Sequence, residues 1–147
     1  LASIGDHSWA GITSDAKIRS TTAEYAERLN LAYRHFDQPS GQLSGGNQQK
    51  VVLSKWLSTS PKLLILDEPT RGVDIGAKHE VHSLIRQLAA EGLAVLMVSS
   101  DLKEILALSD RIAVMRGGTV TATIDRAEAT EELIMRAATQ EEACAAT

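Results

Sequence analysis

The chain has 147 residues and a mass of 15.8 kDa, which fits a single domain. Hydrophobic residues make up 44% and charged residues 23%, so the composition excludes a disordered tail, a collagen-like repeat and a disulfide scaffold. The net charge of -4 argues against a protein that binds nucleic acid mainly through electrostatics. The single cysteine, Cys144, permits no internal disulfide, and no apolar run approaches the length of a membrane span.

Residues 1–40 are polar and helix-like. The sequence predicts a surface helix from Ser14 to Leu29, with Ser14 or Asp15 as its N-cap. A break follows at residues 37–41, which read Asp-Gln-Pro-Ser-Gly. Because the chain starts with Leu1 rather than Met, we expect it to be a fragment of a longer protein.

From residue 43 onward, predicted helices alternate with strands. The first strand is apolar up to an acidic pair at its end and the second is also expected to be buried, which is typical of strands buried on both faces in the middle of a sheet. This alternation predicts βαβ crossovers and an α/β fold with a mostly parallel sheet. The first predicted helix runs from the segment at residues 43–46 to about Leu57, and the others span 76–91, 101–108 and 130–138. The predicted strands span 62–67 and 94–99, and a hairpin pairs 111–115 with 119–124. On the first of these helices, one apolar face is expected to hold Val52, Leu53, Trp56 and Leu57.

The first candidate site is Leu43-Ser44-Gly45-Gly46-Asn47-Gln48-Gln49-Lys50. A serine and two glycines at the start of a helix leave backbone N–H groups and the positive helix end available to an anion. Glycines also let the backbone approach a phosphate closely. The alternative interpretation is an ordinary helix N-cap with a flexible entry.

The second candidate site is Leu63-Leu64-Ile65-Leu66-Asp67-Glu68-Pro69-Thr70. A carboxylate at the tip of a buried strand suits Mg²⁺ held through water, because this ion keeps much of its hydration shell. A second carboxylate one residue later can orient or deprotonate an attacking water. The alternative is a strand that ends in an acidic turn.

Two further features have simpler explanations. The loop Arg71-Gly72-Val73-Asp74 is equally well explained as a turn whose aspartate caps the next helix. His79 and His82 have metal-ligand spacing, but no third ligand accompanies them, so we expect both on a solvated helix face.

Together, LSGGNQQ, LLILDEPT and RGVD closely resemble the ATP-binding subunit of ABC transporters. The form LSGGNQQK with LDEPTRGVD and VSSD most resembles the second half of the tandem ATPases of sugar importers of the ribose, xylose and galactose type. The resemblance covers essentially the whole chain. It implies a P-loop NTPase-like fold, with 1–42 as a helical subdomain segment, 43–128 as core and 129–147 as a C-terminal helix and tail.

The resemblance also assigns roles to residues. Asp67 and Glu68 correspond to the Walker B pair, with Asp67 expected to hold Mg²⁺ through water and Glu68 expected to be catalytic. The residues expected to contact ATP are Ser44, Gly45, Gly46, Asn47 and Gln48 of the signature motif and Asp74 of the D-loop.

Two departures from the family pattern shape the expected mechanism. No G-x-x-x-x-G-K-[S/T] loop occurs, so we expect an incomplete domain that is inactive in isolation and binds ATP weakly. Ser100 stands where the family has its switch histidine, and a hydroxyl lacks the reach and charge of an imidazole. The site of Asp67 and Glu68 is therefore expected to be degenerate, while the signature completes a hydrolytic site in the partner half.

The partners implied are the N-terminal ATPase half of the same polypeptide, membrane permease subunits and an extracytoplasmic sugar-binding protein, with no nucleic acid. The expected location is the cytoplasmic face of the cell membrane, as a peripheral subunit. Two other classes stay open: a soluble ABC-type ATPase of repair or translation, and a non-hydrolytic interaction module.

Overall fold

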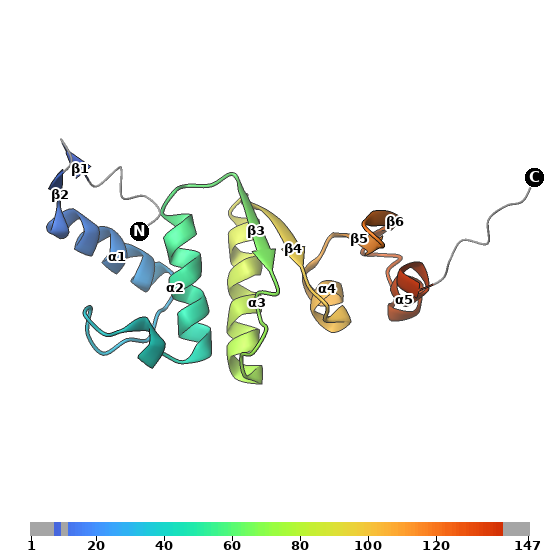
Figure 1. Cartoon of the computed structure of the whole chain (residues 1–147), viewed down its shortest axis with the longest axis horizontal. Helices are drawn as coiled ribbons and strands as arrows, with labels where there is room; N and C mark the ends of the chain where they lie inside the picture. The colour runs from blue at the N-terminus through green and yellow to red at the C-terminus, as the bar shows by residue number, and fades with distance from the viewer. Residues whose placement is uncertain (1–7, 10–11, 140–147) are drawn as a thin grey trace, which may run out of the picture. The chain divides into compact units, whose positions relative to one another are not determined.

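The structure is a computed structural model that describes residues 8–9 and 12–139 (Figure 1). The chain divides into two compact units, Leu1–Val98 and Ser99–Thr147, and each is described by itself below. Cys144 and most of the predicted C-terminal tail lie outside the described residues. No described helix is long and apolar enough to cross a membrane.

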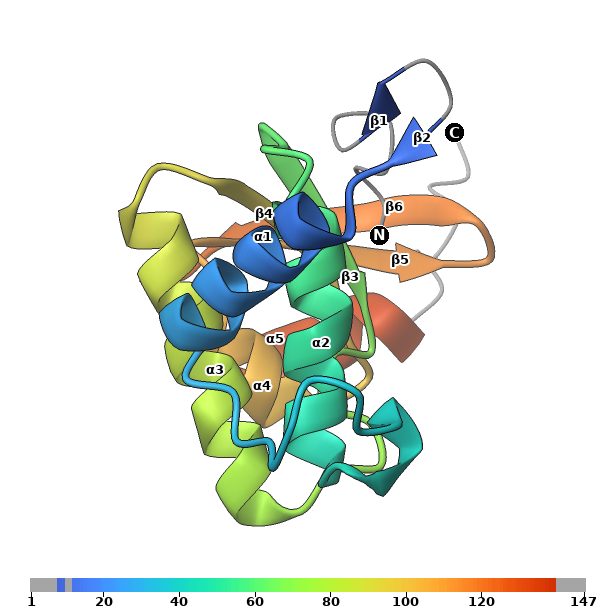
Figure 2. The same ribbon diagram turned by 90° about the vertical axis from the view of Figure 1, so that its left-hand side faces the viewer.

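The first unit consists of helices packed against a short parallel pair of strands. Helices α2 and α3 run side by side, and β3 and β4 lie on the far side of α3 from α1 (Figures 1 and 2). The elements are β1 (Ser8–Trp9), β2 (Ile12–Thr13), α1 (Asp15–Arg28), the 3-10 helix η2 (Ser40–Gln42), α2 (Gly45–Leu57), β3 (Leu63–Asp67), α3 (Ile75–Ala90) and β4 (Ala94–Val98). Strands β1 and β2 pair antiparallel, a pairing that the sequence did not predict.

The predicted helix boundaries are confirmed by their caps. The hydroxyl of Ser14 accepts a hydrogen bond from the backbone N–H of Lys17, as expected for the N-cap of α1. Gly92 has φ +95°, the left-handed conformation that ends a helix such as α3 with little strain.

The core of the first unit is contributed mainly by α2, α3 and β3. Its buried apolar residues are Ala26, Leu29, Leu53, Leu57, Leu64, Leu66, Val81, Leu84, Ile85 and Leu88. The predicted apolar face of α2 is wrong in part, because Val52 is 51% and Trp56 50% exposed. Leu53 and Leu57 are buried, and their neighbours in sequence, Val52 and Trp56, fall on the adjacent face of the helix.

Strands β3 and β4 form the predicted parallel pair, with Leu63 opposite Ala94 and Asp67 opposite Val98. They are not buried on both faces as the sequence predicted. In β3 the exposed Leu63 and Ile65 alternate with buried Leu64 and Leu66. Since side chains alternate across a strand, one face of the pair packs inward and the other is open.

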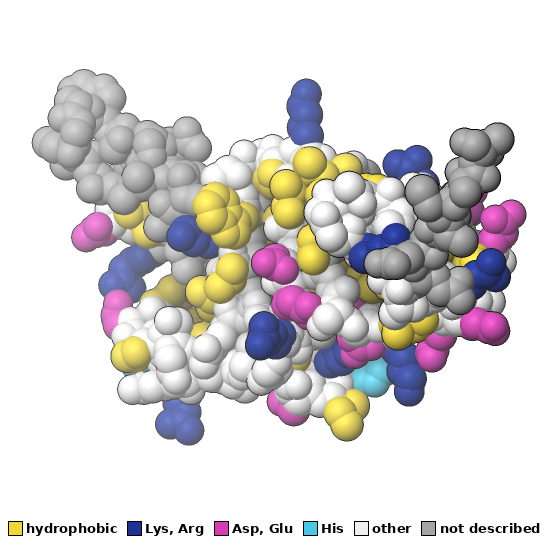
Figure 3. All heavy atoms as spheres, turned by 45° about the vertical axis from the view of Figure 1, so that its right-hand side comes forward, with side chains coloured by type: hydrophobic (Ala, Val, Ile, Leu, Met, Phe, Trp, Pro, Cys, Tyr) yellow, Lys and Arg dark blue, Asp and Glu magenta, His cyan; other side chains and the backbone are white. Residues whose placement is uncertain are grey.

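The open face of β3 continues into a groove beside α2. The groove has a volume of about 380 Å³ and is lined by Val52 and Trp56 of α2 and by Leu63 and Ile65 of β3, among others. Figure 3 shows one face of the molecule, on which several hydrophobic side chains, drawn in yellow, lie at the surface among charged ones. This open apolar face is what a core that lacks part of its sheet would leave.

The second unit is an antiparallel hairpin with two helices. Its elements are α4 (Leu102–Leu108), β5 (Arg111–Arg116), β6 (Thr119–Asp125) and α5 (Glu131–Thr139). The predicted turn is confirmed, with Gly117 at φ +57° and Gly118 at φ +82°, the conformations of a tight hairpin turn. The core consists of Ile112, Val114, Ile124, Ala129 and Ile134.

Both predicted pairings, the parallel pair of β3 with β4 and the hairpin of β5 with β6, are confirmed, and so is the α/β fold class. Among the residues that the structure describes, one of the three pairings is parallel and two are antiparallel. The described residues do not contain the further parallel strands that a mostly parallel sheet would need. The predicted domain limits at residues 42 and 128 stay a prediction.

Candidate functional site

The first candidate residues surround the start of α2. Ser44 occupies the N-cap position in an extended conformation, and its side chain does not cap the helix. Its carbonyl oxygen accepts the first helical hydrogen bond, from the N–H of Gln48 at 2.9 Å. Ser44 and Gly45 are exposed, so the start of the helix is open to solvent, and its predicted contact with a phosphate stays a prediction.

Both glycines lie against the start of α3, and at Gly46 the packing itself requires the absence of a side chain. A Cβ on Gly46 would lie 2.7 Å from the Cβ of Ala77 in α3, closer than atoms can pack. A Cβ on Gly45 would lie 3.3 Å from a methyl group of Val73. The start of α2 thus lies directly against the segment that leads from the acidic turn into α3.

Asn47 and Gln48 make hydrogen bonds within the chain. Nδ2 of Asn47 donates to the hydroxyl oxygen of Ser44 at 2.8 Å, and its Oδ1 accepts from the backbone N–H of Ala32 at 2.9 Å. Nε2 of Gln48 donates to the carbonyl oxygen of Leu43 at 2.9 Å. Both amides therefore shape the loop that enters α2.

Asp67 and Glu68 lie where β3 ends. Asp67 is exposed, and Glu68 has φ +47°, an unusual conformation for a residue other than glycine. The Glu68 N–H donates to the carbonyl oxygen of Val98 at 2.8 Å, and its carbonyl accepts from the N–H of Arg71 at 3.1 Å. These bonds hold a strained turn at the carboxyl end of a parallel strand, where functional side chains commonly sit.

The carboxylate pair fits magnesium. Mg²⁺ is usually held by one or two carboxylates together with waters and substrate phosphates rather than by an all-protein cage. An exposed Asp67 with Glu68 beside it matches that pattern. Across the described ranges, no three histidine, cysteine, aspartate or glutamate side chains cluster closely enough to hold a metal by themselves.

Asp74 caps α3, which is the simpler of its two predicted roles. Its Oδ1 accepts from the backbone N–H of Ala77 at 2.9 Å. Its predicted contact with ATP stays a prediction. Because Ala77 also faces Gly46, Asp74 stabilises the turn of α3 on which the start of α2 packs.

The structure brings several predicted site residues to one end of the first unit. Helix α2 begins, β3 ends and α3 begins toward the same end (Figure 1). Ser100 belongs to the second unit, where it is exposed just before α4. Its predicted role in place of a histidine stays a prediction.

Sequence reasoning missed the role of Lys50. Its side chain is 7% exposed, and its Nζ lies 2.9 Å from a carboxylate oxygen of Glu80 in α3. The same Nζ donates to the backbone carbonyl of Asn30 at 3.0 Å. The spacing along α2 could have indicated this role, because Lys50 lies three residues before Leu53 and seven before Leu57, on the same buried face of the helix.

The expectation for the histidine pair is wrong for His82, which is 7% exposed, and correct for His79. The buried stripe of α3 is wide: it includes Val81, Leu84, Ile85 and Leu88, and His82 falls within it.

The start of α2, the acidic turn after β3 and the start of α3 are the arrangement expected for part of an ATP-binding cassette. The comparisons with known proteins agree with this class. A family model described as "ABC transporter" matches residues 4–71. The chain belongs to the family of ABC transporter ATPase domains.

Curated relatives connect the chain to import ATPases. It is 55% identical to a ribose import ATP-binding protein of Streptomyces coelicolor over 130 residues. This alignment covers 88% of this chain and 26% of the relative. It is 52% identical over 130 residues to a putative ribose/galactose/methyl galactoside import ATP-binding protein of Hahella chejuensis, covering 88% of this chain and 25% of the relative. The chain thus spans about a quarter of the length of these relatives.

Solved structures support the fold. An ATP-binding cassette of an ABC transporter superposes with a TM-score of 0.70 at 29% identity, over 87% of this chain and 50% of that one. A dimeric cassette in a post-hydrolysis state, bound to ADP and phosphate, gives a TM-score of 0.66 at 25% identity, over 80% and 51%. The chain therefore corresponds to about half of such a cassette.

Proposed function

We propose that this chain is part of the ATP-hydrolysing subunit of an ABC importer that couples ATP binding and hydrolysis to the uptake of a sugar. The observation that carries the proposal is the start of α2. There Ser44 and two packed glycines match the family's signature motif and lie against the turn that leads into α3. The similarity to ribose import ATP-binding proteins supports the sugar class.

In this proposal the chain serves two different ATP sites. Ser44, Gly45, Gly46, Asn47 and Gln48 complete the site formed by the other ATPase half of the same polypeptide, where hydrolysis occurs. The exposed start of a helix with a serine hydroxyl supports this role, because both favour a phosphate oxygen.

The chain's own Walker B pair serves the second site. Asp67 holds Mg²⁺ through water and Glu68 faces the attacking water, while Asp74 lies at the interface between the halves. With Ser100 in place of the switch histidine, this second site turns ATP over slowly or not at all. When bound, Mg²⁺ supplies the positive charge that neutralises the phosphates.

The proposed partners follow from the importer assignment. They are the N-terminal ATPase half, membrane permease subunits and an extracytoplasmic sugar-binding protein, with the subunit peripheral on the cytoplasmic face of the membrane. The isolated chain is expected not to hydrolyse ATP, since it contains no Walker A loop.

The test is steady-state ATPase activity of the full-length subunit assembled with its permease. Ser44→Ala removes one hydrogen-bond donor to the developing phosphate charge, and we expect a loss on the order of 100-fold in kcat. Glu68→Gln is expected to cause a much smaller loss, because it acts in the degenerate site. Ser58→Ala, the same change just beyond the other end of α2, is the matched control and should leave activity unchanged.

The outcomes separate the parts of the proposal. A larger loss from Glu68→Gln than from Ser44→Ala overturns the asymmetric assignment of the two sites. If a sugar-loaded binding protein does not stimulate the ATPase activity, the assignment to sugar import is wrong. Gly46→Asp is less informative than Ser44→Ala, because any side chain at position 46 collides with Ala77.

A further inference from the structure

Asn47 has a hydrogen-bond partner on each side of its side-chain amide. The backbone N–H of Ala32 donates to its Oδ1 at 2.9 Å, and its Nδ2 donates to the hydroxyl oxygen of Ser44 at 2.8 Å. Because a backbone N–H can only donate, Ala32 determines which side of the amide is oxygen. The NH2 group is therefore obliged to face Ser44.

This contact constrains the direction of the Ser44 hydroxyl. A serine hydroxyl has one proton to donate and two lone pairs that accept. Once one lone pair accepts from Asn47, the hydroxyl proton is directed away from the amide. A phosphate oxygen can only accept, so a Ser44 held in this way presents the group that a phosphate needs.

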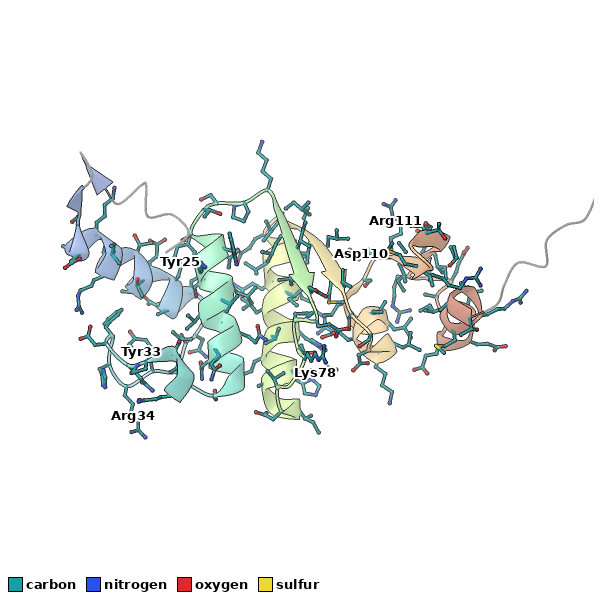
Figure 4. All side chains as sticks on the ribbon, viewed as in Figure 1. Tyr25, Tyr33, Arg34, Lys78, Asp110 and Arg111 are labelled. Atoms are coloured by element: carbon teal, nitrogen blue, oxygen red, sulfur yellow. The ribbon has the colours of Figure 1, made fainter. Side chains whose placement is uncertain are left out.

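The segment that holds Asn47 is itself anchored. Residues 30–32 follow α1 and lead into the loop marked by Tyr33 and Arg34 in Figure 4. The buried Nζ of Lys50 donates to the carbonyl oxygen of Asn30 at 3.0 Å, and the N–H of Leu31 donates to the carbonyl of Ala26 at 2.8 Å. The Ala32 N–H is thus a fixed reference point for the amide of Asn47.

We infer that Asn47 is a positioning residue, which aims the hydroxyl proton of Ser44 at the nucleotide and ties that direction to the segment 30–32. The inference rests on the proposed function, in which Ser44 contacts ATP. It differs from the sequence-based expectation that Asn47 binds the nucleotide itself. Its amide acts on ATP only through Ser44.

A double-mutant cycle on the full-length subunit tests this inference. Ser44→Ala, Asn47→Ala and the double variant are compared by kcat and KM for ATP. We expect Asn47→Ala to lower kcat about fivefold, the worth of one oriented hydrogen bond, and to have no further effect once Ser44 is alanine. A direct contact between Asn47 and ATP would instead lower activity in both backgrounds.

A matched control is available in the same loop. Gln38 also uses its side-chain oxygen to accept from a backbone N–H, that of Arg34 at 2.9 Å, but no bond joins it to Ser44. Gln38→Ala therefore removes a bond of the same type in the loop that follows residues 30–32. It is expected to leave kcat unchanged.

Asn47→Asp separates positioning from a structural role. The aspartate keeps an oxygen for the N–H of Ala32, but its second oxygen can only accept from Ser44 and turns the hydroxyl proton inward. We expect Ala32 to keep its protection in hydrogen exchange while kcat falls at least as far as in Asn47→Ala. Full activity in Asn47→Asp overturns the inference.

These results distinguish the two proposals. An inactive wild-type subunit, or full activity in Ser44→Ala, overturns the proposed function and this inference with it. A strong Ser44→Ala effect with additive effects of Asn47 overturns the inference alone. The same holds if Asn47→Ala accelerates exchange at Ala32 without lowering kcat.

Discussion

At the scale of single residues, Gly46 shows how one position can serve both packing and binding. Glycine at the start of a helix allows a phosphate to approach the backbone, which is the reason given by sequence alone. The structure adds a second reason, because the missing side chain lets α2 lie on Ala77 of α3. Mutations at this position therefore test packing before they test ATP binding.

Gly46→Ala is predicted to destabilise the first unit. The added methyl group would lie 2.7 Å from the Cβ of Ala77, and overpacking of this kind costs about 1–3 kcal/mol. Thermal unfolding of the subunit measures the loss. Gly45→Ala is the control: its new methyl meets only a movable methyl of Val73 at 3.3 Å and should cost less. Ala77→Gly should restore part of the stability of Gly46→Ala, and strict additivity would contradict the packing explanation.

Glu91, at the end of α3, provides a pH-dependent contact between two helices. Its carboxylate accepts hydrogen bonds from Gln87 and from Arg28 of α1. The bond from Gln87, then that from Arg28, lowers the pKa of Glu91 below its usual value. The bond to Glu91 in turn raises the pKa of Arg28.

The sign of the pH effect follows from that direction. A carboxyl with a lowered pKa stabilises the folded state at a pH above the unfolded value of 4.5, and this contribution is lost as the pH falls through the lower folded value. An NMR titration of the Glu91 carboxyl should show the lowered pKa. Gln87→Ala and Arg28→Ala should each move it back up, and the larger change is expected from Gln87→Ala. An unchanged titration in both variants would contradict the assignment.

At the scale of elements, the sequence predicted where the helices begin and end, but it did not predict which of their faces pack against other elements. The caps Ser14 and Asp74 and the stop at Gly92 are local signals, so they can be recognised in the sequence. Which side of α2 is buried depends on where α1 and α3 lie. Tyr25 of α1, for example, lies between α1 and α2 (Figure 4) and donates to the carbonyl of Leu57 at 3.0 Å, a contact between residues distant in sequence.

Lys50→Met is predicted to loosen the packing of α2 against the segment after α1. Methionine fills a similar volume but leaves the carbonyl of Asn30 without its charged donor, at a cost of about 1.5–3 kcal/mol. Hydrogen exchange of the α2 amides reports this local stability. Glu80→Gln is the matched control: it removes the charge of an acid that is 61% exposed but keeps a side-chain oxygen that can accept from Lys50, so it should cost less than Lys50→Met. Equal effects of the two variants would show that the ion pair, rather than the bond to Asn30, is the important contact.

At the scale of the whole molecule, the most informative feature is the open apolar face of β3. Leu63 and Ile65 are 51% and 62% exposed, and they border the groove beside α2. The chain aligns with about half of known cassettes, so the rest of the proposed domain is available to cover this face. Exposed apolar surface next to a strand edge also favours aggregation.

Ile65→Thr is predicted to act in opposite directions in two contexts. In the isolated chain, threonine keeps the β-branched shape and lowers the exposed apolar area, so solubility should rise. In the full-length subunit, the same residue is expected to be buried, and the change should lower stability by about 1–3 kcal/mol. Solubility and thermal unfolding measure the two effects. A full-length subunit unaffected by Ile65→Thr would show that the face stays open, and Val120→Thr, on the exposed part of β6, serves as control.

The sequence by itself determined the family, the order of most elements and the positions of the signature, the acidic pair and the hairpin. Each of these depends on residues close together in the chain. The tertiary structure alone decided that His82 is buried, that β3 has one open face, that Gly46 packs on Ala77 and that Asn47 joins Ala32 to Ser44. The physical reason is that burial and side-chain hydrogen bonds depend on which elements meet in space, and one-dimensional patterns do not specify those neighbours.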